Sequence, residues 1–193
     1  MSAERRNDQN PKPATARVFF ALWPSPAVAG QLGKIADATA VTSGGRATRP
    51  DTIHLTLAFL GNVPEARLPT LAQAAAEVWG DPFTLDIDRL GFWAHNHLVW
   101  AGSSAPHPAL APLQSRLQRT LLAAGFHVGG AARAFVPHVT LVRHVPAAVD
   151  HPALPAIASC AWSNERFVLV RSTLSAQGSS YRIIDEFPLT GAA

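Results

Sequence analysis

Polar and apolar residues alternate along several short segments of the chain, whereas longer segments repeat apolar residues every three or four positions. The strand-like segments are 16–24, 52–60, 83–93, 97–102, 134–145, 165–175 and 180–190. The helix-like segments are 25–40, 64–79 and 106–125. Because helices and strands are mixed in this order, the pattern predicts an α+β fold with helices on the outer faces of sheets.

Local residues indicate where the helices begin and end. Ser25 before Pro26 is typical of an N-cap followed by the first helical position. Pro69 places the start of the second helix near it. The third helix ends at Gly125 and has one apolar face, formed by Leu110, Leu113, Leu117 and Leu121. The first half and the second half each contain a strand, a helix and a further strand, which is a weak internal duplication.

The motif His-x-Thr-Leu occurs twice, at His54 and at His138, 84 residues apart. In a strand, residues two apart point to the same face, so Thr56 joins His54 and Thr140 joins His138. Each strand then has an apolar face for the core and a polar pair opposite. If a pseudo-twofold axis relates the halves, the two polar pairs face each other across a cleft.

A single histidine in a strand is more often a packed or solvated side chain than a catalytic group. Two His-x-Thr-Leu motifs, each on a strand, favour a functional pair. Two imidazoles can act as general base and general acid on opposite sides of one reacting centre. The hydroxyls can bind an anion between them, which suits an in-line displacement at phosphorus without a metal ion or another cofactor.

Composition limits the other possibilities. The chain has 193 residues, 48% of them hydrophobic and 15% charged, with a net charge of +3. This length fits one domain or two small lobes that share a core. Cys160 is the only cysteine, which excludes an internal disulfide and a cysteine metal cluster, and we expect a buried thiol. Residues 1–15 have no signal-peptide character and no segment is long enough to span a membrane, so we expect a flexible N-terminal tail and a cytoplasmic protein.

From residue 16 onward the sequence resembles the two-histidine (2H) phosphoesterases, specifically the RNA 2',3'-cyclic phosphodiesterases, also called the 2'-5' RNA ligase family. The resemblance rests on the following segments: "RVFFAL", "HLTLAFLG", "VWAG", "FVPHVTLVR" and "STLSAQGSSYRI". It implies one bilobal domain over residues 16–193, with two pseudo-symmetric antiparallel sheets around a central cleft. It also implies hydrolysis of RNA 2',3'-cyclic phosphate ends to 2'-phosphates, with transfer RNA fragments among the substrates, and a monomer without an obligate partner.

The resemblance assigns roles to individual residues. His54 matches the general acid, His138 matches the general base, and Thr56 and Thr140 match the phosphate-binding hydroxyls. Arg143 matches an arginine that contacts the phosphate. Strict alternation, however, places Arg143 on the face opposite His138, so the strand must end or twist before this residue for the match to hold.

Other residues have two interpretations each. Phe19 matches a family phenylalanine, and alternation places it on one side with Trp23. It is either a surface on which a base stacks or a core aromatic. Tyr181 also matches a family position, with strand packing as the default. Gly44-Gly45 before Arg46 and Arg49 lacks the spacing of a phosphate-binding loop, so this segment is a surface loop or a rim that meets RNA.

Three other functions remain open at this point. The enzyme could act on a different cyclic phosphate, such as an ADP-ribose cyclic phosphate or a small cyclic nucleotide. The chain could bind RNA ends without turnover, although both histidines and both threonines are intact. It could also join RNA ends through 2'-5' linkages. His95, His97 and His107 are expected to be solvated rather than to bind a metal.

Overall fold

An antiparallel sheet runs through the centre of the molecule in this computed structural model, which describes residues 13–149, 151–176 and 178–191. Its strand order is β10-β9-β1-β3-β7-β6-β5, and β2 pairs with β7. A separate sheet consists of β4 and β8. The strands are β1 (Thr15–Leu22), β2 (Arg46–Ala47), β3 (Leu55–Pro64), β4 (Phe83–Ile87), β5 (Arg89–Trp93), β6 (Leu98–Gly102), β7 (Val139–Arg143), β8 (Cys160–Asn164), β9 (Arg166–Ser175) and β10 (Gly178–Pro188).

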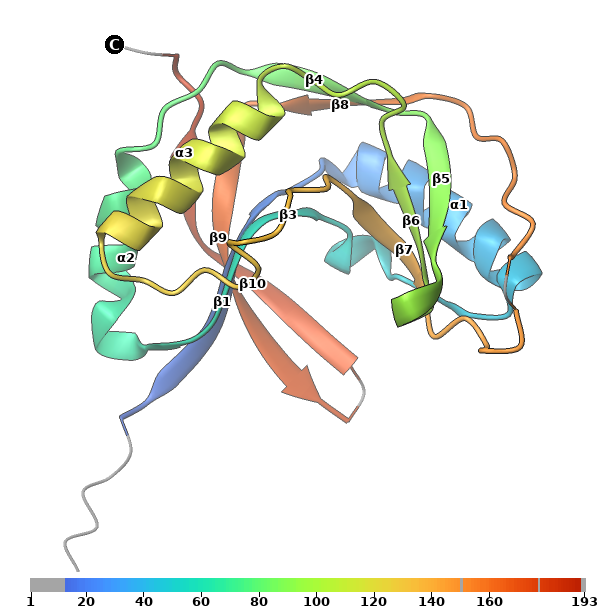
Figure 1. Cartoon of the computed structure of the whole chain (residues 1–193), viewed down its shortest axis with the longest axis horizontal. Coiled ribbons are helices and arrows are strands. Elements are labelled where there is room, and N and C mark those ends of the chain that lie inside the picture. Colours follow the sequence, from blue (N-terminus) through green and yellow to red (C-terminus); the bar gives the residue numbers. More distant parts are fainter. Residues whose placement is uncertain (1–12, 150, 177, 192–193) are drawn as a thin grey trace, which may run out of the picture.

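In the described part of the chain, three α-helices cover the sheet (Figure 1). They are α1 (Pro26–Ser43), α2 (Leu68–Ala76) and α3 (Leu110–Ala123). The helix α1 packs against β7, whereas α3 packs against β3 and α2. Figure 1 shows α2 and α3 on one side of the molecule and α1 on the other. The expected α+β class with helices on the outside is therefore confirmed.

The two halves of the chain have the same connectivity. In the first half α1 lies between the paired strands β1 and β3, and in the second half α3 lies between the paired strands β6 and β7. Each helix packs against a strand of the other half: α1 contacts β7, which follows His138, and α3 contacts β3, which follows His54. The half-sheets β10-β9-β1-β3 and β7-β6-β5 meet where Leu55 pairs with Val139, and both of these residues are buried.

The residues that predict helix ends in the sequence are found at the ends of the helices in the structure. The Ser25 hydroxyl accepts a hydrogen bond from the Val28 amide at 3.3 Å, and Gly44 ends α1 with a φ of 72°. Such a positive φ is accessible to glycine at little cost. All four leucines of the predicted α3 face are buried, and the second helix begins at Leu68, one residue before Pro69.

The segment 83–93 is two strands instead of the single strand that the pattern predicts. β4 pairs with β8, while β5 forms the expected hairpin with β6. The break falls at Asp88, whose carboxylate accepts hydrogen bonds from the amide and hydroxyl of Ser104. β8 lies at the end of a proline-rich connection, and its pairing with β4 spans about 75 residues of sequence, so no local pattern indicates it.

Other expectations concern the chain's ends and its cysteine. Residues 1–12 of the predicted tail lie outside the described part of the chain, and β1 already begins at Thr15. The Ala14 carbonyl accepts a hydrogen bond from the Glu65 amide at 2.9 Å. Cys160 is buried, as expected, and burial raises the pKa of its thiol. None of the helices in the described part is long and apolar enough to cross a membrane.

Candidate active site

Both motif histidines directly precede a strand and are held by the same backbone contact. The Nδ1 atom of His54 lies 2.7 Å from the carbonyl oxygen of Thr52, and Nδ1 of His138 lies 2.8 Å from that of Val136. A carbonyl oxygen only accepts hydrogen bonds, so Nδ1 carries the proton and donates it in each ring. The Nε2 atom of each imidazole is therefore the one available for proton transfer.

The central strand pair brings the two motifs to one face of the sheet. Leu55 pairs with Val139 in an antiparallel register. Extending that register by one residue on each side places His54 opposite Thr140 and Thr56 opposite His138. The His54 ring is close enough to His138 for a charge on one to disfavour a charge on the other. The structure thus brings together the four residues that the repeated motif predicts.

Arg143 reaches this face because β7 contains an irregularity. The pairing of β6 with β7 shifts register between Val99 and Trp100, which leaves Leu141 without a direct partner in β6. Leu141 and Val142 are consecutive and both are buried, so alternation moves by one position. An extra residue of this kind, a β-bulge, moves the side chains that follow it to the opposite face of the sheet. Arg143 is therefore on the side of Thr140, and the conflict with strict alternation disappears.

The same irregularity occurs at the corresponding place in β3. The pairing of β1 with β3 shifts register after Phe20, and Leu57 and Ala58 are consecutive buried residues. Phe59 follows them as Arg143 follows Leu141 and Val142. The cross-strand partners also correspond, because Arg46 pairs with Arg143 and Gly129 bridges to Phe59. The pseudo-twofold axis thus relates a cation on one side of the histidines to an aromatic ring on the other.

Burial lowers the pKa of both imidazoles. The pKa of His54 is lowered to about 4, mainly by burial and further by the charges of Arg143 and His138, against the opposing effect of the Thr52 hydrogen bond. Burial and Arg143 also lower the pKa of His138, while its hydrogen bond to Val136 raises it. Both rings are therefore mostly neutral near pH 7 in the free protein.

Aromatic side chains provide much of this burial around His54. Trp23 stacks on the ring at 5.5 Å with planes 7° apart, and Tyr181 meets it edge-on at 5.3 Å. Phe19 lies 4.8 Å from the His54 ring and is only 4% exposed. It has no free face on which a base could stack, so the structure corrects that expectation in favour of a core aromatic that supports His54. Trp93 meets His138 edge-on at 4.5 Å.

Two cavities flank the histidine pair. One, of about 460 Å³, is lined by Arg143 together with Thr52 and Tyr181, which contact His54. The other, of about 500 Å³, is lined by His138, Thr56 and Phe59. Both volumes are within the range of small-ligand sites. The cleft therefore has a cationic compartment on the His54 side and a more aromatic compartment on the His138 side.

Several aromatic residues that contact the histidines were not predicted as site residues from the sequence. Trp23 could have been selected, because it alternates with Phe19 along the first strand. Tyr181 and Trp93 contact the histidines from strands that are distant in sequence. His107 was expected to be solvated, yet it stacks on Phe83 at 4.9 Å. Within the described residues there is no group of three or more His, Cys, Asp or Glu side chains placed to hold a metal ion.

Two symmetric His-x-Thr motifs that share one face of a cleft define a two-histidine phosphoesterase. The family model described as LigT like Phosphoesterase matches residues 22–100. The RNA 2',3'-cyclic phosphodiesterase of Escherichia coli K12 is 31% identical over 146 residues, covering 76% of this chain and 81% of the relative. The Thermus thermophilus protein of the same name is 28% identical over 183 residues and covers 91% of both chains.

The structural comparison agrees with the sequence comparison. The crystal structure of E. coli LigT complexed with 3'-AMP superposes with a TM-score of 0.81 at 28% identity, covering 92% of this chain and 99% of that one. The chain belongs to the LigT-like phosphoesterases of the 2H superfamily. The expectation of a phosphoesterase is thereby confirmed.

Proposed function

We propose that this enzyme hydrolyses the 2',3'-cyclic phosphate ends of RNA to 2'-phosphates, with His54 and His138 as the acid–base pair. The observation that carries the proposal is the matched anchoring of the two rings. Each Nδ1 donates to the carbonyl oxygen two residues earlier, which leaves each Nε2 free on the same face. The names of the E. coli and T. thermophilus relatives support the choice of substrate.

The reaction balances with these two groups alone. His138 Nε2 accepts a proton from water as the water oxygen forms a bond to phosphorus. The bond between phosphorus and O3' breaks, and the proton on His54 Nε2 moves to O3'. The phosphate stays on O2'. The Thr56 and Thr140 hydroxyls and the Arg143 guanidinium hold the non-bridging oxygens, where negative charge develops.

The acid has to gain its proton before it can act. With a pKa of about 4, His54 lacks a proton on Nε2 at neutral pH in the free protein. An anionic phosphate beside the ring favours the imidazolium and raises its pKa. Substrate binding therefore supplies the condition under which His54 can be the general acid, and the rate should have a bell-shaped dependence on pH.

A panel of cyclic phosphates tests the proposed substrate. It contains an RNA oligonucleotide with a 2',3'-cyclic end, an ADP-ribose cyclic phosphate and 3',5'-cyclic nucleotides, each assayed with and without EDTA. We expect the highest kcat/KM with the RNA and no effect of EDTA, because the two imidazoles perform both proton transfers. Preference for another member of the panel would identify a different phosphodiesterase. Binding of the RNA end without product would identify an end-binding module.

The cavity beside His138 favours a second reaction at the same site. Its volume of about 500 Å³ leaves room for a nucleoside where the mechanism places the attacking water. A 5'-hydroxyl that loses its proton to His138 would form a 2'-5' linkage instead of a 2'-phosphate. Joined RNA from a cyclic-ended strand and a 5'-hydroxyl strand would test this activity.

A further inference from the structure

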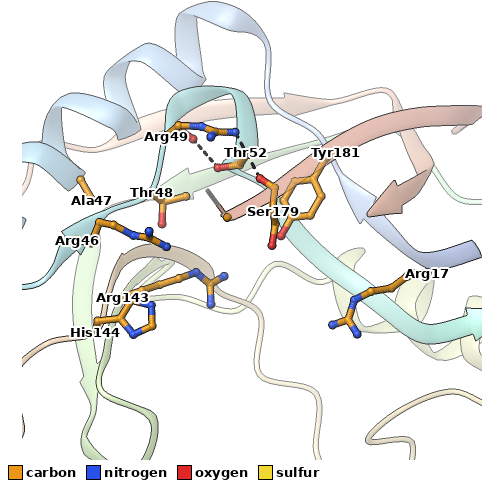
Figure 2. A pocket seen from close by; sticks show the side chains of 11 residues that line it. Arg17, Arg46, Ala47, Thr48, Arg49, Thr52, Arg143, His144, Ser179 and Tyr181 are labelled. Atoms are coloured by element: carbon orange, nitrogen blue, oxygen red, sulfur yellow. Dashed lines mark hydrogen bonds between the residues drawn. The ribbon is translucent and has the colours of Figure 1, made fainter. Parts of the chain in front are cut away.

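The cavity on the His54 side has an unusually cationic wall. Its lining includes Arg17, Arg46, Arg49, Arg143 and His144, and it includes no carboxylate. We call this space the arginine cavity. The arginines come from three separate parts of the chain, namely β1, the segment of β2 with the loop after it, and β7 (Figure 2).

The charges of Arg46 and Arg143 are directly opposed. The two residues are partners in the antiparallel β2–β7 register, and like charges in this position destabilise a sheet. Arg171 and Arg182 are opposed in the same way between β9 and β10, but Glu65 forms a salt bridge to Arg171 at 3.1 Å. In the described part of the chain no carboxylate forms a salt bridge with Arg46 or Arg143. A bound anion would offset the repulsion between Arg46 and Arg143.

The remaining arginines extend the positive surface across the cavity. Figure 2 shows Arg17 across the opening from Arg46 and Arg143, with the guanidinium groups directed into the space between them. Arg17 is held over the Phe59 ring at 4.7 Å. Arg49 is fixed by Asp51 at 3.0 Å and by the Ser179 carbonyl oxygen at 3.4 Å. A ligand that contacts both walls therefore meets arginines from β1 on one side and from β2 and β7 on the other.

The position of the cavity relative to His54 indicates which part of a substrate enters it. Thr52 and Tyr181 line the cavity and also contact the His54 ring. In the proposed mechanism His54 protonates O3', so the terminal ribose lies on this side and the water lies on the side of His138. The rest of an RNA chain is attached to that same ribose through its 5' carbon, and it must leave the site on the His54 side.

We propose that the arginine cavity binds the phosphodiester backbone of the RNA chain that leads to the cyclic end. This proposal rests on the proposed function, because the roles of the two histidines decide on which side the RNA chain leaves the site. It makes oligonucleotides, rather than cyclic mononucleotides, the preferred substrate class. Arginine is suited to this role because its planar guanidinium binds phosphate with two parallel hydrogen bonds.

The test compares two substrates that share the same reacting end. These are a 2',3'-cyclic mononucleotide and a trinucleotide that ends in that nucleotide. We expect the wild-type enzyme to prefer the trinucleotide. Arg46→Gln and Arg17→Gln should each lower kcat/KM for the trinucleotide roughly tenfold, since each loses a charge-assisted hydrogen bond, and change it about twofold or less for the mononucleotide. Arg119→Gln on the outer helix α3 removes the same charge and should change neither.

The possible results distinguish RNA binding in the arginine cavity from catalysis at the histidines. Equal losses on both substrates would overturn the inference, because the arginines would then act at the reacting phosphate. No loss on either substrate, or equal wild-type turnover of both, would also overturn it while leaving the phosphodiesterase intact. If the wild type turns over neither substrate, the proposed function fails. Binding of a trinucleotide with a 2'-phosphate end then decides: the inference predicts weaker affinity for Arg46→Gln than for Arg119→Gln, and equal affinities would refute it.

Discussion

Leu55 of β3 pairs with Val139 of β7 at the centre of the molecule, and each residue directly follows a motif histidine. An antiparallel pair has a local twofold axis, so the residues before and after it occupy equivalent positions on one face. This relationship explains how two motifs 84 residues apart form one site. It also explains why both rings have the same anchoring through Nδ1.

Replacement of either histidine by asparagine should abolish most of the activity. The asparagine amide can keep a donor near the carbonyl oxygen of Thr52 or Val136, but it lacks the Nε2 atom that moves the proton. We expect kcat/KM to fall by about 10² to 10⁴ in His54→Asn and His138→Asn, the usual contribution of a general acid or base. His127→Asn is the matched control, because His127 is an exposed histidine that does not line either cavity. Wild-type activity in either motif variant, or an equal loss of activity in the control, would contradict the assignment.

Phosphate binding should raise the pKa of His54. In the free protein burial lowers this pKa to about 4, and a bound anion favours the protonated ring. Proton or nitrogen NMR titration of the imidazole should show the midpoint moving upward when a 2'-phosphorylated nucleotide is present. A midpoint that stays near 4 in the complex would mean that His54 cannot supply the proton at neutral pH.

Removing the charge of Arg143 should raise the pKa of both His54 and His138. This charge lowers the pKa of His54 and of His138 in the free protein. Arg143→Gln should therefore raise both pKa values, by less than burial lowers them, while turnover falls because a phosphate contact is lost. The measurement is an NMR titration alongside kcat/KM, with Arg119→Gln as the charge-matched control. A change in the pKa of only one histidine would show that the charge of Arg143 does not act on both rings.

The buried histidines should make the protein less stable in acid. The folded-state pKa of His54 is about 4 and its unfolded value is about 6.5, so the unfolded chain binds the proton first as pH falls. The contribution of the neutral ring is fully present above pH 6.5 and is lost progressively as pH falls toward 4. The total is roughly 3 to 4 kcal/mol, because the pKa falls from 6.5 to about 4 and one pKa unit corresponds to about 1.4 kcal/mol.

Urea unfolding at pH 7.5 and at pH 4.5 measures this effect. The difference in unfolding free energy between the two pH values should be smaller in His54→Asn than in the wild type, since asparagine does not titrate. The exposed control His127→Asn should keep the wild-type difference. An equal pH dependence in all three proteins would show that His54 is not held in its neutral form by the fold.

The sequence predicts the parts of this site that depend on local periodicity. Alternation alone places Thr56 beside His54 and Thr140 beside His138, and the repeated motif indicates two equivalent halves. The leucine face of α3 follows from helical spacing in the same way. These features are local because their period is fixed by the backbone of a strand or a helix.

The remaining features depend on contacts between distant segments. The side taken by Arg143 is decided by an irregularity in the β6–β7 pairing, which is visible only once the register with Trp100 is known. Phe19 is buried because β1 is flanked by β3 and β9 and because Tyr181 from β10 closes over it. The opposition of Arg46 and Arg143 likewise requires the pairing of β2 with β7.

The most direct test of the two-histidine account is to identify the product formed from RNA with a 2',3'-cyclic end. If His54 protonates O3' while His138 activates water, the sole product is a 2'-phosphate, and neither His54→Asn nor His138→Asn forms it at a significant rate. A 3'-phosphate product, or a 2'-phosphate formed at the wild-type rate by either variant, would contradict the account.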